Sequence, residues 1–344
     1  MILAGGLSTR LYPLTKLVPK PLVPIAGVPN AANLLRYLRQ YGFDEVVINV
    51  HYLADAIVAA LGDGSRYAVK LHYSYEPELL GSAGGVKNVE SFFGEEPFVV
   101  IGCDEVTDMR LDQVIAFHRE RAAIATIGLV ECEEVDQYGV VVLDERGKIV
   151  GFQEKPAKGT ERSKLANTGV YIFSPAIFEH IPAGEFYDFG NQVFPSLQAA
   201  GEPFYGFDAQ GAYWADIGTP REYRRASFDV VRGVLRIPQT TPNGIDPTAS
   251  VAGDARIEGP VRIGASVRVG PGVSIVGPTI LDDGVRVDAG ALLERTICWE
   301  NSTIGAGAKL RDTVVGSSYT VEPESNLSGV LVARDDRATP SSVH

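Results

Sequence analysis

An aliphatic residue at every sixth position restricts the C-terminal part of this chain to one kind of architecture. The repeated positions are Ile245, Val251, Ile257, Ile263, Val269, Ile275, Leu281, Val287 and Leu293. In a hexapeptide coil each short strand buries one such side chain, and small residues form the corners. The period therefore predicts a left-handed parallel β-helix over residues 245–332.

Two breaks interrupt this period. It slips at Trp299, resumes at Ile304 and slips again before Val315. The repeat contains no histidine. Hexapeptide acyltransferases generally use a histidine of the coil as base, so a second, acyl-transferring activity is disfavoured. We interpret the coil as an assembly or regulatory element, through which a homo-oligomer is expected.

A loop of small residues with two cations follows an apolar strand at the other end of the chain. Gly5 and Gly6 let the backbone turn sharply and let a ligand approach its N–H groups. Arg10 offers a planar fork for phosphate, and Lys20 offers a point charge stiffened by the prolines beside it. This N-terminal loop, residues 5–22, suits a polyphosphate. The alternative is an ordinary glycine-rich turn, since the loop matches neither the Walker pattern nor G-x-G-x-x-G.

Apolar strands alternate with helices from residue 44 to residue 130. This order predicts an α/β fold with a doubly wound, Rossmann-like parallel sheet, in which ligands sit beyond the carboxyl ends of the strands. Gly5, Gly81 and Asp104 fall at such ends. Strands with short connections follow over residues 139–173, and helices and strands continue to about Val234.

These patterns predict four parts. They are an α/β domain over 1–236, a linker rich in proline over 237–244, the β-helix over 245–332 and a polar tail over 333–344.

Composition excludes several classes of partner. The formal net charge is −12, which disfavours nucleic acid and anionic membranes. No apolar stretch approaches the length of a membrane span. Three scattered cysteines, Cys103, Cys132 and Cys298, fit reduced thiols in a cytoplasmic protein better than a disulfide framework or a zinc site.

The N-terminal string Leu-Ala-Gly-Gly-Leu-Ser-Thr-Arg-Leu, continued by Pro-Leu-Thr and Pro-Lys-Pro-Leu, resembles the signature of the nucleoside-diphosphate-sugar pyrophosphorylases. The resemblance covers Leu3 to about Leu327. Ser8 stands where the family usually has glycine. Relatives also carry several more strand residues before the motif, so a native start upstream of Met1 stays an open alternative.

The resemblance implies a set of nucleotide-binding residues. They are Leu3, Ala4, Gly5, Gly6, Ser8, Thr9, Gly81, Ser82, Ala83 and Gly102. The segment from Leu80 to Gly84 is similar to that of guanylyl-transferring members, with Ser82 in place of threonine. Its alternative reading is a plain helix start with Ser82 as the cap.

The resemblance also implies a metal site and a sugar-phosphate site. Asp104 and Asp216, each at the end of a strand, are expected to hold Mg²⁺. Glu154-Lys155-Pro156 resembles the family's sugar-binding F-x-E-K-P. The expected sugar-phosphate contacts are Gly139, Glu154, Lys155, Asn167, Thr168 and Gly169.

The implied reaction joins an NTP and a sugar 1-phosphate to give an NDP-sugar and pyrophosphate. Arg10, Lys20, Asp104, Lys155 and Asp216 are the expected catalytic residues. GTP with mannose 1-phosphate is the favoured pair. The alternatives are a glucose-1-phosphate uridylyl- or thymidylyltransferase, and a non-catalytic regulatory paralogue that binds NDP-sugar.

Overall fold

The computed structural model describes residues 1–237 and 243–334. The predicted linker, 237–244, lies mostly outside the described residues, and so does most of the predicted polar tail, 333–344. Both remain predictions, as does the division of the chain at residue 236.

The chain forms two compact units that do not follow the order of the sequence. The first contains Met1–Leu7 and Leu34–Asp216, and the second contains Ser8–Asn33 and Ile217–His344. Most of the N-terminal loop therefore packs in the same unit as the β-helix.

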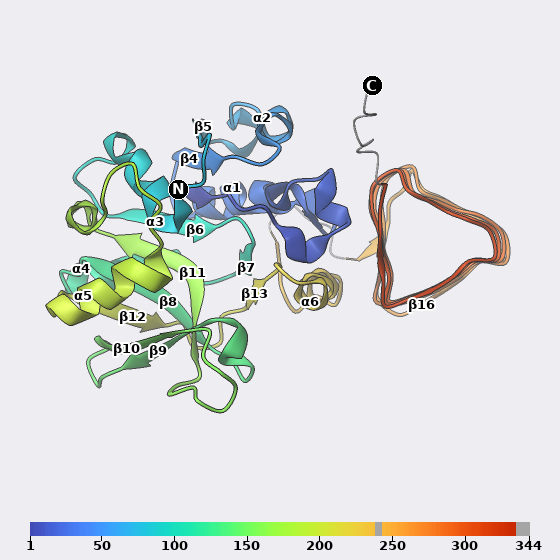
Figure 1. Ribbon diagram of the computed structural model, residues 1–344. Coiled ribbons are helices and arrows are strands. Elements are labelled where there is room, and N and C mark those ends of the chain that lie inside the picture. The colour runs from blue at the N-terminus through green and yellow to red at the C-terminus, as the bar shows by residue number, and fades with distance from the viewer. Residues whose placement is uncertain (238–242, 335–344) are drawn as a thin grey trace, which may run out of the picture. The chain divides into compact units, whose positions relative to one another are not determined.

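A nine-stranded mixed sheet forms the first unit (Figure 1). Its strands are β1 (Ile2–Leu3), β4 (Glu45–Val50), β5 (Lys70–Tyr75), β6 (Phe98–Gly102), β8 (Ala125–Glu131), β9 (Gly139–Leu143), β10 (Ile149–Glu154), β11 (Leu165–Phe173) and β12 (Phe204–Asp208). Its main path runs β10-β9-β11-β6-β1-β4-β5, and β8 joins β11 to β12. β6, β1, β4 and β5 are parallel, as predicted. β11 is antiparallel to β6 and β8, because the β9–β10 hairpin reverses the direction of the chain between β8 and β11.

Helices connect these strands near the predicted positions. They are α1 (Asn30–Gln40), α2 (Ala54–Leu61), α3 (Gly81–Asn88), α4 (Leu111–Glu120) and α5 (Phe194–Ala200). α4 packs against β8, β11 and β12, and α5 packs against β10. Where the chain is described, none of its helices has the length and apolar character needed to cross a bilayer.

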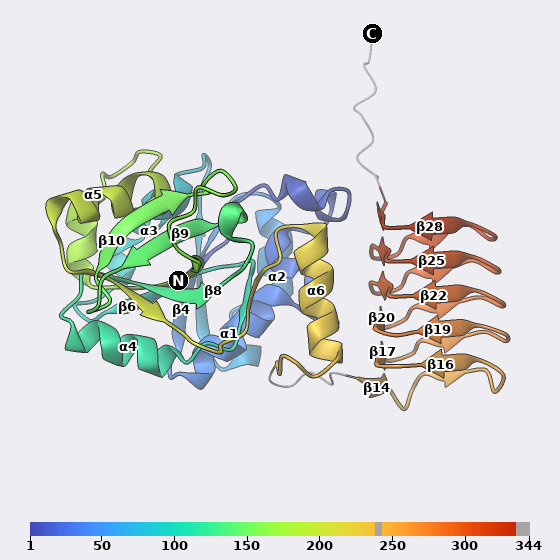
Figure 2. The ribbon, with the colours of Figure 1, turned by 90° about the horizontal axis from the view of Figure 1, so that it is seen from below.

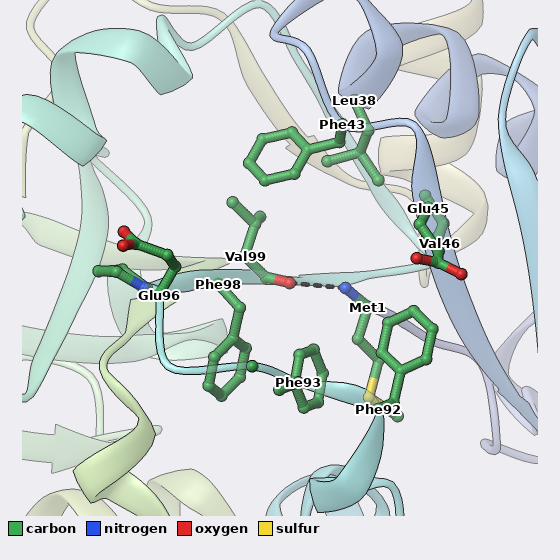
Figure 3. Close-up of a pocket in the computed structure, with 12 residues that line it drawn as sticks. Met1, Leu38, Phe43, Glu45, Val46, Phe92, Phe93, Glu96, Phe98 and Val99 are labelled. Atoms are coloured by element: carbon green, nitrogen blue, oxygen red, sulfur yellow. Dashed lines mark hydrogen bonds between the residues drawn. The ribbon is translucent and has the colours of Figure 1, made fainter.

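The amino end of β1 lies beside a pocket of about 230 Å³ (Figure 3). The Met1 amino group is buried there and donates a hydrogen bond to the Val99 carbonyl oxygen at 2.6 Å. Burial lowers the pKa of this amino group to about 5. Ligands of parallel α/β sheets bind at the carboxyl ends of the strands, so this pocket is at the opposite end from the expected site.

The β-helix of the second unit consists of parallel sheets with three faces, seen end-on in Figure 1 and from the side in Figure 2. One face contains β14 (Gly244–Ile245), β17 (Val261–Ile263), β20 (Thr279–Leu281), β23 (Ile297–Cys298), β26 (Val314–Val315) and β29 (Leu331–Val332). The second contains β15 (Ser250–Val251), β18 (Arg268–Val269), β21 (Arg286–Val287), β24 (Thr303–Ile304) and β27 (Thr320–Val321). The third contains β16 (Arg256–Glu258), β19 (Ser274–Val276), β22 (Leu292–Glu294), β25 (Lys309–Arg311) and β28 (Asn326–Ser328). The repeat thus folds as the coil that it predicts.

The length of each coil explains the two breaks in the repeat. Ile263 pairs with Leu281, eighteen residues on. Leu281 pairs with Cys298, seventeen residues on, and Cys298 pairs with Val315 after another seventeen. Each shortened coil removes one residue from a corner and leaves the aliphatic side chains pointing inward.

The rest of the second unit contains a short hairpin and a helix. A short hairpin of β2 (Pro24–Ile25) and β3 (Val28–Pro29) follows the N-terminal loop. α6 (Pro220–Val231) begins after Thr219, whose hydroxyl oxygen accepts a hydrogen bond from the Glu222 N–H at 3.3 Å.

Leu293 tests the packing of the coil, because its neighbour Leu292 provides a matched control. The Leu293 side chain is fully buried in the core of the coil, whereas Leu292 is half-buried on the outer side of the same strand. Leu293→Ala should lower the free energy of unfolding by about 2–5 kcal/mol. Leu292→Ala should lower the free energy of unfolding by clearly less. Equal losses in urea unfolding would contradict the register of β22.

His118 makes stability depend on pH. Its ring is 1% exposed, with Nδ1 2.9 Å from Thr126 Oγ and Nε2 3.0 Å from Ser174 Oγ. Burial, helped by the charge of Arg119, lowers the pKa of His118 to about 4. The unfolded chain binds this proton near pH 6.5, so stability is present above that pH and is lost as the pH falls toward 4.

Between pH 7 and pH 5 this group should remove about 2 kcal/mol from the free energy of unfolding. Urea unfolding of the native chain and of His118→Gln over this range measures the effect. The variant should show the flatter profile, and parallel profiles would show that His118 is not the group responsible.

Candidate active site

The carboxyl ends of β1 and β6 lie side by side. Leu3 pairs in parallel with Gly102 of β6 and with Asn49 of β4. Gly5 and Asp104 each follow two residues beyond that pairing. They therefore leave the sheet at the same edge, as the strand order predicted.

A buried amide holds the backbone at this edge. The Asn49 side-chain oxygen accepts a hydrogen bond from the Ala4 N–H at 2.8 Å. The Asn49 Nδ2 donates to Glu76 Oε1 at 2.9 Å. Asn49 is 3% exposed and Glu76 is 1% exposed, so both groups depend on each other for hydrogen bonding.

Glu76 also reaches the start of α3. Its second oxygen accepts from the Leu80 N–H at 3.4 Å. A Cβ on Gly85 would lie 2.7 Å from Glu76 Oε1, and one on Gly5 would lie 3.1 Å from Asn49 Nδ2. Glycine at these two positions therefore makes room for the buried pair. The sequence interpretation missed both polar residues, since Asn49 sits inside an apolar strand.

The Leu80–Gly84 segment is fixed from the other side by Tyr187. The Tyr187 carbonyl oxygen accepts hydrogen bonds from the N–H groups of Ala83 and Gly84, both at 3.0 Å. The Tyr187 N–H donates to the Leu80 oxygen at 2.8 Å. The amides of Ala83 and Gly84 thus already have partners, and the nucleotide contacts of Gly81, Ser82 and Ala83 remain a prediction.

Asp188 connects this segment to the expected sugar site. Ser82 Oγ donates to Asp188 Oδ2 at 2.9 Å and accepts from the Phe189 N–H at 2.9 Å. Asp188 Oδ1 accepts from the Gly190 N–H at 3.0 Å and caps the π-helical turn Phe189–Val193. Asp188 was not predicted. An aspartate directly before a helix is the signal that could have identified it.

Glu154 ends β10, and its carboxylate lies close to the backbone of Gly139 and Gly190. It pairs with Gly139 across the two strands. A Cβ on Gly190 would lie 2.8 Å from Glu154 Oε2, and one on Gly139 would lie 3.2 Å from it. Burial raises the pKa of Glu154, while the charge of Lys155, whose Nζ lies 3.7 Å from Glu154 Oε1, opposes this.

Asn167 lies at the point where the regular pairing of β11 with β8 is interrupted. Its Oδ1 accepts from the Gly169 N–H at 3.0 Å, and its Nδ2 donates to the Tyr171 hydroxyl at 3.2 Å. The Thr168 hydroxyl is buried and donates to the Gly128 oxygen at 2.7 Å. A Cβ on Gly139 would lie 3.4 Å from Asn167 Cβ, so the structure brings Gly139, Glu154 and Asn167 together, whereas the Thr168 side chain faces the interior.

A short antiparallel strand pair contains Asp216, one of the two predicted metal ligands, and begins directly after the other, Asp104. β7 (Glu105–Thr107) pairs with β13 (Trp214–Asp216), and Asp216 lies opposite Glu105, the neighbour of Asp104. Over residues 1–237 and 243–334 no group of three or more His, Cys, Asp and Glu side chains could hold a metal ion. Mg²⁺ commonly binds through one or two carboxylates together with water and substrate phosphate oxygens. Asp104 and Asp216 fit an ion held in that way.

Glu105 is a buried carboxylate that sequence reasoning missed. It is 7% exposed, and its Oε2 accepts a hydrogen bond from the Trp214 indole N–H at 2.7 Å. The same N–H lies 3.0 Å from the Thr168 oxygen. Any side chain on Gly169, which has φ of +70°, would overlap Glu105 Oε1. Glu105 thus fixes β13, the strand that ends at Asp216, against the Thr168–Gly169 turn.

Four predicted residues of the N-terminal loop lie in the second unit, namely Ser8, Thr9, Arg10 and Lys20. Ser8 has a left-handed backbone with φ of +55°, which explains why glycine suits that position, and its carbonyl oxygen accepts from Thr15 Oγ1 at 2.6 Å. Thr9 and Arg10 belong to the 3₁₀ turn Thr9–Leu11. Lys20 starts another such turn, and its oxygen accepts from the Val23 N–H at 3.1 Å.

Comparison with known proteins matches both parts of the chain. Residues 1–232 match the family described as "Nucleotidyl transferase", and residues 240–340 match the "GMPPB C-terminal domain". A UTP–glucose-1-phosphate uridylyltransferase of Synechocystis is 40% identical over 98% of this chain and 92% of its own length. A mannose-1-phosphate guanylyltransferase of Mycobacterium tuberculosis is 34% identical over 86% of this chain and 82% of its own length. The crystal structure of HddC from Yersinia pseudotuberculosis superposes with a TM-score of 0.58 at 30% identity, over 66% of this chain and 96% of that one.

Asn49→Leu tests the buried pair beneath Gly5. The change removes the acceptor of the Ala4 N–H and leaves the Glu76 carboxylate without its amide donor, so it should cost about 2–4 kcal/mol of unfolding free energy. The double variant Asn49→Leu/Glu76→Leu removes both partners and should recover part of that loss. Urea unfolding measures both variants, and a double variant no more stable than Asn49→Leu would contradict the pairing.

Proposed function

Because the chain belongs to the nucleotidyl transferase family, we propose that it transfers a nucleoside monophosphate from an NTP to a sugar 1-phosphate and releases pyrophosphate. The observation that carries the proposal is the pairing of Asp216 opposite Glu105, beside Asp104. That pairing lies in the same unit as the Gly139–Glu154 hairpin. Asp188 binds the Ser82 hydroxyl of the nucleotide segment and the N–H of Gly190, and Gly190 lies against Glu154 of the hairpin.

In the proposed mechanism an oxygen of the sugar phosphate attacks the α-phosphorus of the NTP in line. This oxygen is already anionic at neutral pH, so no side-chain nucleophile is required. Arg10 and Lys20 supply positive charge to the α-phosphate and to the departing pyrophosphate. Lys155 holds the attacking phosphate, and Glu154 with Asn167 orients the sugar hydroxyls. The chain thus contributes positioning and neutralisation of charge.

Mg²⁺ is the divalent ion that we propose for Asp104 and Asp216. When bound, it neutralises phosphate charge and helps to orient the phosphates. Cys103, Cys132 and Cys298 form no disulfide in the part of the chain that the structure describes, which supports the cytoplasmic location that we propose with this activity.

We propose GTP and mannose 1-phosphate as the substrates. The guanylyl-type segment from Leu80 to Gly84 and the match to the GMPPB C-terminal domain support this pair. A second candidate is UTP with glucose 1-phosphate, because the 40% identical relative carries the name of that activity. A non-catalytic paralogue is disfavoured, since Arg10, Lys20, Asp104, Lys155 and Asp216 are all present.

Pyrophosphate release with Mg²⁺ tests the proposal over a grid of four NTPs against mannose, glucose, galactose and N-acetylglucosamine 1-phosphates. Turnover should be fastest with GTP and mannose 1-phosphate. Arg10→Ala should lower kcat at least about 10²-fold, as expected for a cation that stabilises transferring phosphate. Arg119→Ala is the control, because that side chain of α4 is exposed and forms an ion pair with Glu96.

The outcomes separate the parts of the proposal. Turnover with a different substrate pair would overturn the assignment of base and sugar and would support the transfer itself. Absence of turnover in the whole grid, from folded protein that binds an NDP-sugar, would contradict the catalytic proposal and favour the regulatory paralogue.

A further inference from the structure

Trp299, where the hexapeptide repeat first slips, occupies a corner of the β-helix that a regular coil fills with smaller residues. It follows β23 and is 1% exposed. The shortened coil aligns it with Asp282, which follows β20, because Leu281 pairs with Cys298. Trp299 therefore faces another part of the second unit, not the core of the coil.

That part is Tyr223 of α6. The Trp299 indole N–H donates to the Tyr223 hydroxyl oxygen at 2.7 Å, and the two rings meet edge to face with centroids 6.2 Å apart. The Tyr223 hydroxyl in turn donates to the Pro24 carbonyl oxygen at 3.0 Å. Tyr223 is fully buried, so a single phenol connects the β-helix to the segment that follows the N-terminal loop.

The segment from Pro19 to Asn30 is stiff, and Lys20 lies within it. The Leu22 N–H donates to the Pro19 oxygen at 2.8 Å, and the Asn30 N–H donates to the Val23 oxygen at 3.1 Å. Prolines fix the backbone at residues 19, 21, 24 and 29. We therefore expect a displacement at Pro24 to reach Lys20.

A second contact holds the tip of the same hairpin. Gly27 has φ of +78°, and a Cβ on it would lie 2.7 Å from the Arg262 guanidinium of β17. Arg262 Nη1 lies 3.1 Å from Asp282 Oδ1, which fixes the guanidinium in this place. The coils that contain Arg262 and Asp282 thus support the hairpin tip. The next coil, which contains Trp299, supports Pro24 through Tyr223.

We propose that Trp299 and Tyr223 are positioning residues, through which the β-helix holds Lys20 in place for nucleotidyl transfer. The role of Lys20 rests on the proposed function, whereas the physical coupling of Trp299 to the Pro19–Asn30 segment does not. The β-helix then positions a catalytic residue of its own chain, in addition to any role in assembly.

The test compares the full-length chain with Trp299→Phe, Tyr223→Phe and the double variant. Each single change removes hydrogen bonding and keeps an aromatic ring. Ile275→Val is the control, because it removes one methylene from the core of the coil and touches neither residue.

Hydrogen–deuterium exchange is the first readout and does not depend on activity. Amides of the Pro19–Asn30 segment should exchange about 10-fold faster in Tyr223→Phe and in Trp299→Phe than in the native chain. The control should leave that segment unchanged. Exchange equal to that of the control in both variants would overturn the coupling.

Steady-state kinetics is the second readout. In the variants kcat should fall about 10- to 100-fold, the size of effect expected when a reacting group is displaced, with KM for the sugar phosphate nearly unchanged. The double variant should match Tyr223→Phe, because both residues act through one hydroxyl. Native kcat in both variants would overturn the positioning role. A native chain inactive in the whole grid would contradict the proposed function, while faster exchange in the variants would still support the coupling.

Discussion

The buried Asn49–Glu76 pair is the interaction on which the candidate site of the first unit depends. It holds the Ala4 backbone as β1 ends and, through the second Glu76 oxygen, the Leu80 amide before α3. Two segments far apart in the sequence are thus tied to one buried polar group. Such a pair is costly when incomplete and rigid when complete, which suits a site that works by holding substrates in place.

The other polar groups of the site serve the same purpose. Asp188 ties the Ser82 hydroxyl to the Gly190 amide, and Glu105 ties Trp214 to the Thr168–Gly169 turn. Glycines stand where these carboxylates pass close to the backbone. The proposed transfer needs no side-chain nucleophile, so the accuracy with which charges are placed decides its rate.

Sequence reasoning found the parts of the structure that depend on periodicity. The six-residue repeat predicted the β-helix, and the apolar strands predicted the edge at which Gly5 and Asp104 emerge. It missed the β7–β13 pair, because its two strands are short and lie more than a hundred residues apart. It missed Asn49 and Asp188 as well, since a polar residue in a strand and a cap before a helix have ordinary structural explanations. The slip at Trp299 was visible in the sequence, but its partner Tyr223 was identified only by the fold.

The central claim is that the chain transfers a nucleotidyl group directly between two bound phosphates. The stereochemistry at the α-phosphorus tests it, with GTP that carries a single sulfur-substituted configuration at that atom and mannose 1-phosphate as acceptor. One in-line attack inverts the configuration in the NDP-sugar product, and inversion is the predicted result. Retention would require two displacements through a covalent nucleotidyl-enzyme, and it would contradict the account.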